Sequence, residues 1–261
     1  MAERPSYPFT SALVTGASSG IGEELTRQLT AAGVSVVVVA RRGDRLQALA
    51  DELPGVEVLA ADLLTAAGQD VVADRIADPD RPIDLLVNNA GFGTSGSFHR
   101  ADPDRLDDEI RLNVGALTRL SHVALATMVP RRRGWLLNVA SVAGFQPGPH
   151  LAVYAATKAF VISLSESLHE EVKRDGVTVT ALCPGLIRTE FQEISNTENY
   201  QTEFPGFVWC EVDDVVRDGL AATAKGRAVV VPGALYKATT WVGGVTPRWA
   251  KRLASGIIPR N

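Results

Sequence analysis

A tyrosine and a lysine four residues apart, Tyr154 and Lys158, are the residues of this chain best suited to acid–base chemistry. Four residues make about one turn of an α-helix, so both side chains point to one face of the helix predicted for this segment. A phenol has an ordinary pKa of about 10, too high for efficient proton transfer at neutral pH unless a neighbouring cation stabilises the phenolate. Lys158 supplies that cation, and the pair predicts proton exchange with a substrate oxygen.

Ser141 adds a hydroxyl at the end of a predicted strand that precedes this helix. It is expected to donate a hydrogen bond to the substrate oxygen as negative charge develops there, an interaction that strengthens in the transition state. The alternative is a structural role, with a buried tyrosine whose hydroxyl is satisfied and an exposed helical lysine. A nucleotide-binding loop elsewhere in the chain favours catalysis.

That loop is the glycine-rich segment Thr15-Gly16-Ala17-Ser18-Ser19-Gly20-Ile21-Gly22, which separates the first apolar run from the first helical pattern. Glycine at such a junction permits a tight turn and the close approach of a ligand to the backbone. The free N–H groups and the positive end of the following helix attract a pyrophosphate. A dinucleotide site is therefore predicted, although a purely structural turn would need glycine too.

The end of the second predicted strand indicates which dinucleotide binds. Enzymes that bind NAD place an acidic residue there on the ribose 2′-hydroxyl, whereas this chain has Ala40 followed by Arg41 and Arg42. Guanidinium groups match a phosphate in geometry and charge, so NADP(H) is predicted in preference to NAD(H). The alternative is that both arginines are solvated at a helix start, with Asp44 as the N-cap. Asp62, after the third strand, either accepts a hydrogen bond from an adenine amino group or caps a helix.

Seven short apolar runs rich in β-branched residues predict the strands that position these side chains. They are Ala12–Thr15, Val34–Ala40, Val56–Ala60, Ile83–Val87, Trp135–Val139, Val177–Cys183 and Ala228–Val231. Helical periodicity lies between them, as in the stripe Val153, Ala156, Phe160, Leu164 and Leu168. Strands that are apolar on both faces and alternate with helices indicate an α/β fold with a doubly wound, seven-stranded parallel sheet of the Rossmann type. Residues 1–261 are expected to form a single domain.

Composition and charge exclude several classes of function. The chain has 261 residues, a formal net charge of -4 and two cysteines. The acidic balance, with arginines spread along the chain, argues against a nucleic acid partner. His and Cys spacing does not resemble a metal site, and no apolar run reaches the length of a signal core or a membrane span. A cytoplasmic protein without a bound metal is expected.

Taken together, the motifs resemble those of the short-chain dehydrogenase/reductase family, in its shorter branch. The resemblance spans about residues 10 to 190 and is carried by Thr15-Gly16-x-x-x-Gly20-x-Gly22, Asp62, Asn88-Asn89-Ala90-Gly91, Asn113, Ser141, Tyr154-x-x-x-Lys158, and Pro184-Gly185 with Thr189. It implies that Tyr154 is the general acid/base and that Lys158 tunes it and binds the nicotinamide ribose. It also implies that Ser141 orients the carbonyl and that Asn113 holds a water in a proton relay. A homodimer or homotetramer, formed through the helices that precede and follow the fifth strand, is implied as well.

The resemblance also marks the residues expected to line the cofactor. They are Gly16, Ser18, Ser19, Gly20, Ile21, Gly22, Arg41, Arg42, Asp62, Leu63, Asn89, Ala90, Gly91, Tyr154, Lys158, Pro184, Gly185, Ile187 and Thr189. One position departs from the pattern of many NADP-binding members, which carry a basic residue before the second glycine of the loop. Because that position is Ser19 here, the predicted 2′-phosphate contact depends on Arg41, with Arg42 as an additional contact.

A substrate lid is expected at about residues 190–210, a segment dense in aromatic residues: Phe191, Tyr200, Phe204, Phe207 and Trp209. They either pack beneath a mobile lid or form the wall of an apolar pocket. Further aromatic residues occur in other loops at the same edge of the sheet: Phe92, Phe98 and Phe145. No Arg or Lys lies between Thr189 and Trp209 to bind an anionic group. The predicted function is therefore an NADP(H)-dependent oxidoreductase that moves a hydride between nicotinamide and an apolar ketone, aldehyde or secondary alcohol, with reduction favoured.

Two alternatives stay open at this point. A sensor or scaffold protein on the same fold would bind NADP(H) without turnover, although it would have no need of a tuned phenol. The tail from about residue 233, which contains Trp241, Trp249 and several cations, either docks on the protein or contacts a membrane surface. Docking is preferred.

Overall fold

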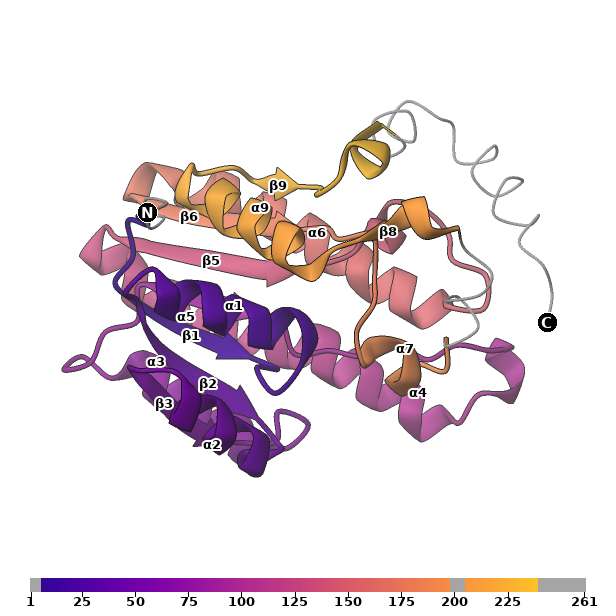
Figure 1. Cartoon of the computed structure of the whole chain (residues 1–261), viewed down its shortest axis with the longest axis horizontal. Helices are drawn as coiled ribbons and strands as arrows, with labels where there is room; N and C mark the ends of the chain where they lie inside the picture. The colour runs from indigo at the N-terminus through magenta and orange to yellow at the C-terminus, as the bar shows by residue number, and fades with distance from the viewer. Residues whose placement is uncertain (1–5, 198–204, 239–261) are drawn as a thin grey trace.

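A parallel β-sheet runs through the middle of the molecule, and helices cover both of its faces (Figure 1). The computed structural model describes residues 6–197 and 205–238. Within these residues, seven strands form the sheet in the order β3-β2-β1-β4-β5-β6-β9. Their bounds are β1 Ser11–Thr15, β2 Ser35–Ala40, β3 Val56–Ala60, β4 Leu85–Asn88, β5 Gly134–Val139, β6 Val177–Leu182 and β9 Val229–Val230. All seven predicted strands are confirmed, and the fold is a single Rossmann-like α/β domain.

The helices are divided between the two faces of this sheet. One core lies under α1 (Gly20–Ala31), α2 (Gly43–Glu52) and α9 (Val212–Ala224). The other lies under α3 (Ala66–Ala77), α5 (Leu117–Arg131) and α6 (Ala152–Val172). Strand β2 shows why the runs are apolar throughout: Val36 and Val38 enter the first core, and Val37 and Val39 enter the second.

Helix α6 does not bury the stripe that its periodicity suggested. Its buried residues are Ala155, Thr157, Lys158, Val161, Ile162, Ser165 and Val172. Phe160, from the predicted stripe, is 40% exposed. Three of the buried residues are polar: Thr157, Lys158 and Ser165. The hydrophobic periodicity therefore indicated a neighbouring face of the helix in place of the face that packs against the protein.

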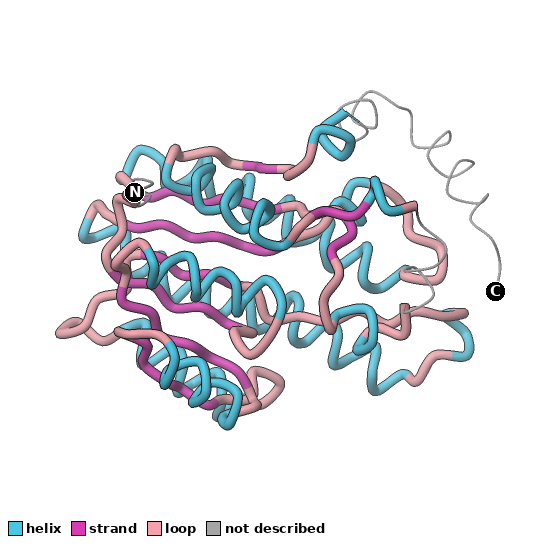
Figure 2. Tube along the Cα trace, in the orientation of Figure 1, coloured by secondary structure: helices cyan, strands magenta, loops and turns pink. Residues whose placement is uncertain are grey.

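The parallel strands of the main sheet all end at one edge of the molecule. In Figure 1 the strand arrows point toward the side where α4 (Pro103–Ile110) and α7 (Phe191–Ile194) lie, and Figure 2 shows the loops that gather there. Strands β7 (Leu186–Ile187) and β8 (Trp209–Cys210) lie at this edge. They pair with each other in a separate two-stranded sheet and are not part of the main sheet. The short helical turns are η1 Phe98–Arg100, η2 Arg111–Ala116, η3 Val142–Phe145, η4 Lys173–Asp175 and η5 Gly206–Val208.

Parts of the predicted lid and tail fall outside the described residues. Tyr200 and Phe204 of the lid do so, as do Trp241 and Trp249 of the tail. Residues 234–238 are helical. Among the helices of the described residues, none is long and apolar enough to cross a membrane.

Candidate active site

The glycine-rich loop between β1 and α1 packs tightly against the end of β4. Gly16 and Gly20 have φ angles of 67° and 57°, which glycine adopts without strain. A Cβ atom on Gly22 would lie 2.3 Å from the carbonyl oxygen of Gly16. Asn89 fixes the loop, since its Nδ2 donates to the carbonyl oxygens of Thr15 (2.9 Å) and Gly16 (3.2 Å). Ser19, the N-cap of α1, makes no side-chain capping bond, so the first backbone N–H groups of the helix keep their capacity to bind a pyrophosphate.

A second segment, Pro184 to Thr189, closes over this loop from the end of β6. A Cβ atom on Gly20 would lie 3.2 Å from the Thr189 side chain. Gln192 holds Thr189 in place, because its Oε1 accepts a hydrogen bond from the Thr189 backbone N–H (3.0 Å) and its Nε2 donates to the carbonyl oxygen of Ile187 (2.7 Å). The glycine loop and this segment, both predicted to line the cofactor, are thus brought together.

The alternatives in which Asp62 and Asp44 cap helices are wrong. The N-cap of α3 is Thr65, whose hydroxyl accepts from the Gly68 N–H (3.0 Å), whereas Asp62 accepts from the Leu64 N–H (3.0 Å) in the preceding turn. Asp44 lies in the first turn of α2, not at its N-cap. The adenine contact therefore stays as the prediction for Asp62.

Arg42, more than Arg41, is built into the nucleotide loop. Its Nε and Nη2 donate to the Ser18 hydroxyl at 3.2 and 3.0 Å, and Nη2 also donates to the Ser19 hydroxyl at 3.0 Å. Its Nη1 donates to a Glu190 carboxylate oxygen at 2.9 Å. Arg41 is exposed. The guanidinium of Arg42 thus stands beside Ser19, the position at which an expected basic residue is missing from the sequence.

The predicted catalytic residues of β5, η3 and α6 lie together at the same edge. Lys158 Nζ donates to the Val139 carbonyl oxygen at 2.7 Å and lies 5.6 Å from the centroid of the Tyr154 ring. Ser141 is the N-cap of η3, and its hydroxyl accepts from the Ala143 N–H at 3.1 Å. The same hydroxyl lies close enough to the Tyr154 phenol to lower its pKa.

Burial dominates the titration of Tyr154 and Lys158. It raises the pKa of Tyr154 to about 12, against the lowering effect of the Ser141 hydrogen bond, and Glu109 raises it further. It lowers the pKa of Lys158 to about 8. The expected depression of the phenol pKa by Lys158 is therefore absent from the protein alone. Tyr154 carries its proton at neutral pH, which suits donation to a carbonyl oxygen.

Asn113 is positioned by η2, a turn of π-helix between α4 and α5. Its Oδ1 accepts from the Phe92 N–H at 3.1 Å, and its Nδ2 donates to the Phe92 carbonyl oxygen (2.8 Å) and the Thr157 hydroxyl (3.2 Å). A Cβ atom on Gly91 would lie 2.7 Å from Asn113 Oδ1 and 3.7 Å from Lys158 Nζ. The π-turn, a feature common at functional sites, thus brings Asn113 next to Lys158. Sequence reasoning predicted the residue but not the turn.

A buried acidic residue beside the site was missed. Glu109 is 0% exposed, and neither carboxylate oxygen makes a well-formed hydrogen bond with the described residues. Burial raises the pKa of Glu109, while the neighbouring Thr94 hydroxyl and the charges of Arg105 and Lys158 lower it. It lies in the acidic run Asp107-Asp108-Glu109, a pattern typical of a solvated helix face, so the sequence carries no signal of its burial.

The described lid residues pack in different ways. The Phe191 ring lies against Tyr154, with 5.3 Å between centroids, and Trp209 is buried beneath the Arg188 guanidinium at 4.9 Å. Phe207 is 77% exposed. Arg105, a cation that the sequence analysis did not consider, stacks 5.0 Å over Phe92 and donates to the carbonyl oxygen of Ile194.

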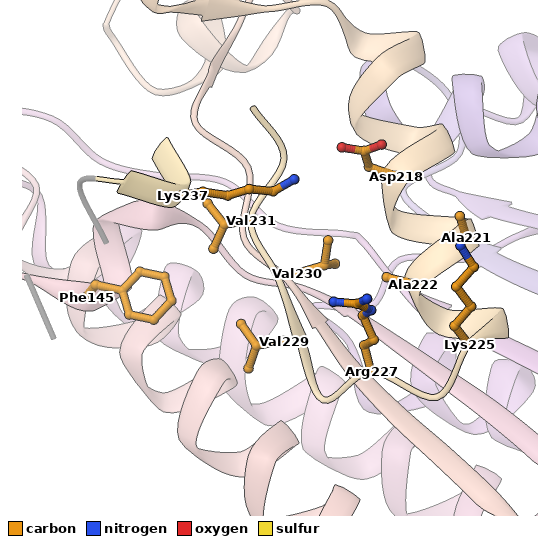
Figure 3. Close-up of a pocket in the computed structure, with 10 residues that line it drawn as sticks. All are labelled: Phe145, Asp218, Ala221, Ala222, Lys225, Arg227, Val229, Val230, Val231 and Lys237. Carbon is orange, nitrogen blue, oxygen red and sulfur yellow. The ribbon is translucent and has the colours of Figure 1, made fainter. Parts of the chain in front are cut away.

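A groove of about 600 Å³ lies elsewhere, between α9 and the region of β9 (Figure 3). Asp218, Arg227 and Lys237 contribute charged groups to it, and the predicted catalytic residues do not line it. The described residues contain no cluster of three or more His, Cys, Asp or Glu side chains that could hold a metal. The groove is therefore separate from the predicted catalytic residues.

Comparison with known proteins identifies the family. A family model described as short chain dehydrogenase matches residues 10–199. The chain belongs to the short-chain dehydrogenase family. Membership makes it an NAD(P)-dependent oxidoreductase that acts on CH–OH or C=O groups of small molecules. An uncharacterised oxidoreductase of Myxococcus xanthus, a member with similar length, is 36% identical over 255 residues, covering 96% of this chain and 95% of the relative.

Two solved structures resemble this short-chain dehydrogenase over nearly its whole length. One is a short-chain dehydrogenase from Sphingobium yanoikuyae in complex with NADPH, at 34% identity and a TM-score of 0.82, with 95% of this chain and 96% of the other covered. The second is a bulky-bulky ketone specific alcohol dehydrogenase from Comamonas testosteroni, at 30% identity and a TM-score of 0.75, with 92% and 95% covered. The residues that the sequence singled out at the strand ends thus belong to a fold shared with known dehydrogenases.

Proposed function

We propose that the protein is an NADP(H)-dependent reductase of apolar ketones or aldehydes, which also catalyses the reverse oxidation of the secondary or primary alcohol. The observation that carries the cofactor preference is Arg42, whose guanidinium is held against Ser18 and Ser19 of the nucleotide loop. A cation fixed there suits a 2′-phosphate, and a neutral ribose hydroxyl would not need it. NADPH in the Sphingobium relative supports the assignment.

The chain's own residues then divide the acid–base work. The cofactor supplies or accepts the hydride when bound. Tyr154, protonated at neutral pH, gives its proton to the carbonyl oxygen, and the Ser141 hydroxyl hydrogen-bonds to that oxygen as charge develops. Lys158 holds a positive charge beside the phenol and binds the nicotinamide ribose. Asn113 holds the water that returns a proton to the site.

The apolar substrate class is supported by the side chains around Tyr154. Phe191 covers one side of the phenol ring. Apart from Lys158, two arginines of neighbouring segments stack on aromatic rings, Arg188 on Trp209 and Arg105 on Phe92. Such surroundings favour an uncharged substrate. The Comamonas relative is described as specific for bulky ketones, which agrees with this class.

The same proposal extends to assembly and location. Phe160 on α6, 40% exposed, gives an apolar contact for a second copy, so a homodimer or homotetramer through α5 and α6 is proposed. The proposed location is the cytoplasm.

The test is NADPH oxidation over a panel of bulky apolar ketones, aldehydes and small keto acids, with NADH and the variants Tyr154→Phe and Arg42→Ala in parallel. We expect turnover of apolar ketones with NADPH, and a loss of about 1,000-fold in kcat for Tyr154→Phe. NADPH binding by Tyr154→Phe, followed by fluorescence, is expected to persist. Preferential turnover of small keto acids would contradict the substrate class. Tight NADPH binding without any turnover would support the sensor alternative instead.

A further inference from the structure

Glu190, the first residue of the lid, is held by two arginines. Arg42 is the N-cap residue of α2, and Arg45 lies within that helix. One carboxylate oxygen accepts from Arg42 Nη1 at 2.9 Å, and the other accepts from Arg45 Nη1 at 2.5 Å. These hydrogen bonds hold the pKa of Glu190 below its ordinary value. Two guanidinium groups around one anion form the kind of site that also binds a phosphate.

Arg42 does not depend on Glu190 for its orientation. Its Nε and Nη2 are bound by the hydroxyls of Ser18 and Ser19, and Nη1 alone is directed to the carboxylate. Removing the charge of Glu190 therefore leaves the guanidinium in place beside the nucleotide loop. It makes a cationic N–H group available at the position where the proposed function puts the 2′-phosphate.

Glu190 also joins two parts of the site. It directly follows Thr189, which lies against Gly20 of the nucleotide loop, and it is the N-cap residue of α7. The next residue, Phe191, contacts the Tyr154 ring. The ion pair with Arg42 thus connects the start of the lid to the cofactor loop across 148 positions of sequence.

We propose that Glu190 is a specificity-determining residue that competes with the 2′-phosphate of NADP(H) for Arg42, and so weakens NADP(H) binding relative to NAD(H). The inference rests on the proposed use of NADP(H). A dianionic phosphate beside a fixed carboxylate is repelled, whereas the 2′-hydroxyl of NAD(H) is not. Because the side chains of Arg42 and Glu190 are 38% and 36% exposed, solvent and salt screen the repulsion, and the effect is moderate.

The experiment compares dissociation constants of NADPH and NADH, measured by fluorescence titration at low salt, for the wild type, Glu190→Gln and Glu193→Gln. Glu193 is the matched control, since it lies on the same helix, is exposed and forms no ion pair with the described residues. We expect Glu190→Gln to bind NADPH about five- to tenfold more tightly and NADH within about twofold of wild type. Glu193→Gln is expected to leave both constants within about twofold. The gain for Glu190→Gln should shrink as salt is added.

Adenosine 2′,5′-bisphosphate and adenosine 5′-monophosphate, titrated in the same way, localise the effect to the phosphate. Tighter binding of the bisphosphate alone supports the inference. Unchanged or weaker NADPH binding by Glu190→Gln, or an equal gain for NADPH and NADH, overturns it.

Arg42→Ala separates this inference from the proposed function. Weaker NADPH binding by Arg42→Ala, together with unchanged binding by Glu190→Gln, would leave the NADP(H) assignment standing and remove the role of Glu190. A wild type that binds NADH as tightly as NADPH, with Arg42→Ala indifferent, would overturn the cofactor assignment itself.

Discussion

At the level of single residues, desolvation affects the pKa of the Tyr154 phenol more than the neighbouring Lys158 does. Burial disfavours the phenolate and the ammonium alike, and it moves the two pKa values apart, to about 12 for Tyr154 and about 8 for Lys158. Both groups are protonated at neutral pH. The protein alone is thus prepared for proton donation, the direction that carbonyl reduction requires.

Glu109 is expected to reduce the stability of the protein at neutral pH. Its pKa is raised in the folded state, chiefly by burial, so folding favours the protonated carboxyl. The stability that this preference contributes is present below the ordinary carboxyl value of 4.5 and is lost as the pH rises through the folded pKa. Glu109→Gln should therefore unfold with a free energy about 1 kcal/mol higher than wild type at pH 7, because it removes a buried charge without a good hydrogen bond.

Urea unfolding between pH 4 and pH 8 checks this prediction. The difference in the free energy of unfolding between Glu109→Gln and the wild type should grow as the pH rises. Asp107→Asn, at an exposed position on the same helix, should show no such gap. A Glu109→Gln protein that is less stable than wild type at pH 7 would contradict the sign.

Residue identities in the site could be predicted from the sequence far better than their contacts. Tyr154, Lys158, Ser141 and Asn113 could be singled out from the sequence because their types and order are typical of one chemistry, and their catalytic roles stay predictions. The contacts of Arg42 were not predicted, since its bonds to Ser18 and Ser19 span 24 and 23 positions and depend on how α2 meets the glycine loop. No local pattern contains that information.

At the level of elements, the long strands were predictable and the short irregular pieces were not. Runs such as β2 are apolar on both faces because both faces are covered, and that produces a strong pattern. Strands β7 and β8 have two residues each, too few for any periodicity. The π-turn that carries Asn113 has the sequence of an ordinary helix, so only the three-dimensional packing of α4 against α6 reveals it.

The junction between the glycine loop and α1 should be intolerant of a single added methyl group. In Gly22→Ala the new Cβ would meet the Gly16 carbonyl oxygen at 2.3 Å and Asn89 Nδ2 at 2.6 Å. We expect a loss of about 1–3 kcal/mol in stability, as is usual for overpacking, and NADPH binding at least about tenfold weaker. Thermal unfolding and fluorescence titration measure the two effects.

Gly115→Ala is the control, because a Cβ on this helical glycine would meet nothing within 4 Å. It should be neutral or stabilising by up to about 1 kcal/mol, since alanine is the better helix former. Equal destabilisation by both variants would show that steric crowding at the loop is not the cause.

At the level of the whole molecule, the two ends of the sheet have separate tasks. The strand ends bear the site, whereas the strand starts are joined by Asp84, whose carboxylate accepts from the Thr10 N–H and hydroxyl at 3.0 Å and from Arg133 at 3.2 and 3.3 Å. Burial raises the pKa of Asp84, but these hydrogen bonds outweigh it and the net change is downward. The group therefore ties β1, β4 and β5 together on the side away from catalysis.

Asp84→Asn should lower the stability of the protein while leaving the rate of turnover intact. A lowered carboxyl pKa contributes stability above the ordinary value of 3.8 and loses it as the pH falls through the folded pKa. We expect a loss of about 1.5–3 kcal/mol at pH 7, because hydrogen bonds to a charged group are broken, and a smaller difference below about pH 4. Urea unfolding at pH 3 to 7 tests it; a difference that is constant with pH would exclude an ionic contribution.

The two cysteines of the chain differ in a way that makes the lid open to direct observation. Cys183 is completely buried and its thiol pKa is raised to about 12, so it is protected from alkylating reagents. Burial raises the pKa of the Cys210 thiol too, but Cys210 is partly accessible on β8, where it pairs with Ile187 of the segment that closes over the glycine-rich loop. A thiol-reactive fluorophore should therefore mark the native protein at one position, beside Trp209, and show whether that segment moves when the cofactor binds, without any engineered residue.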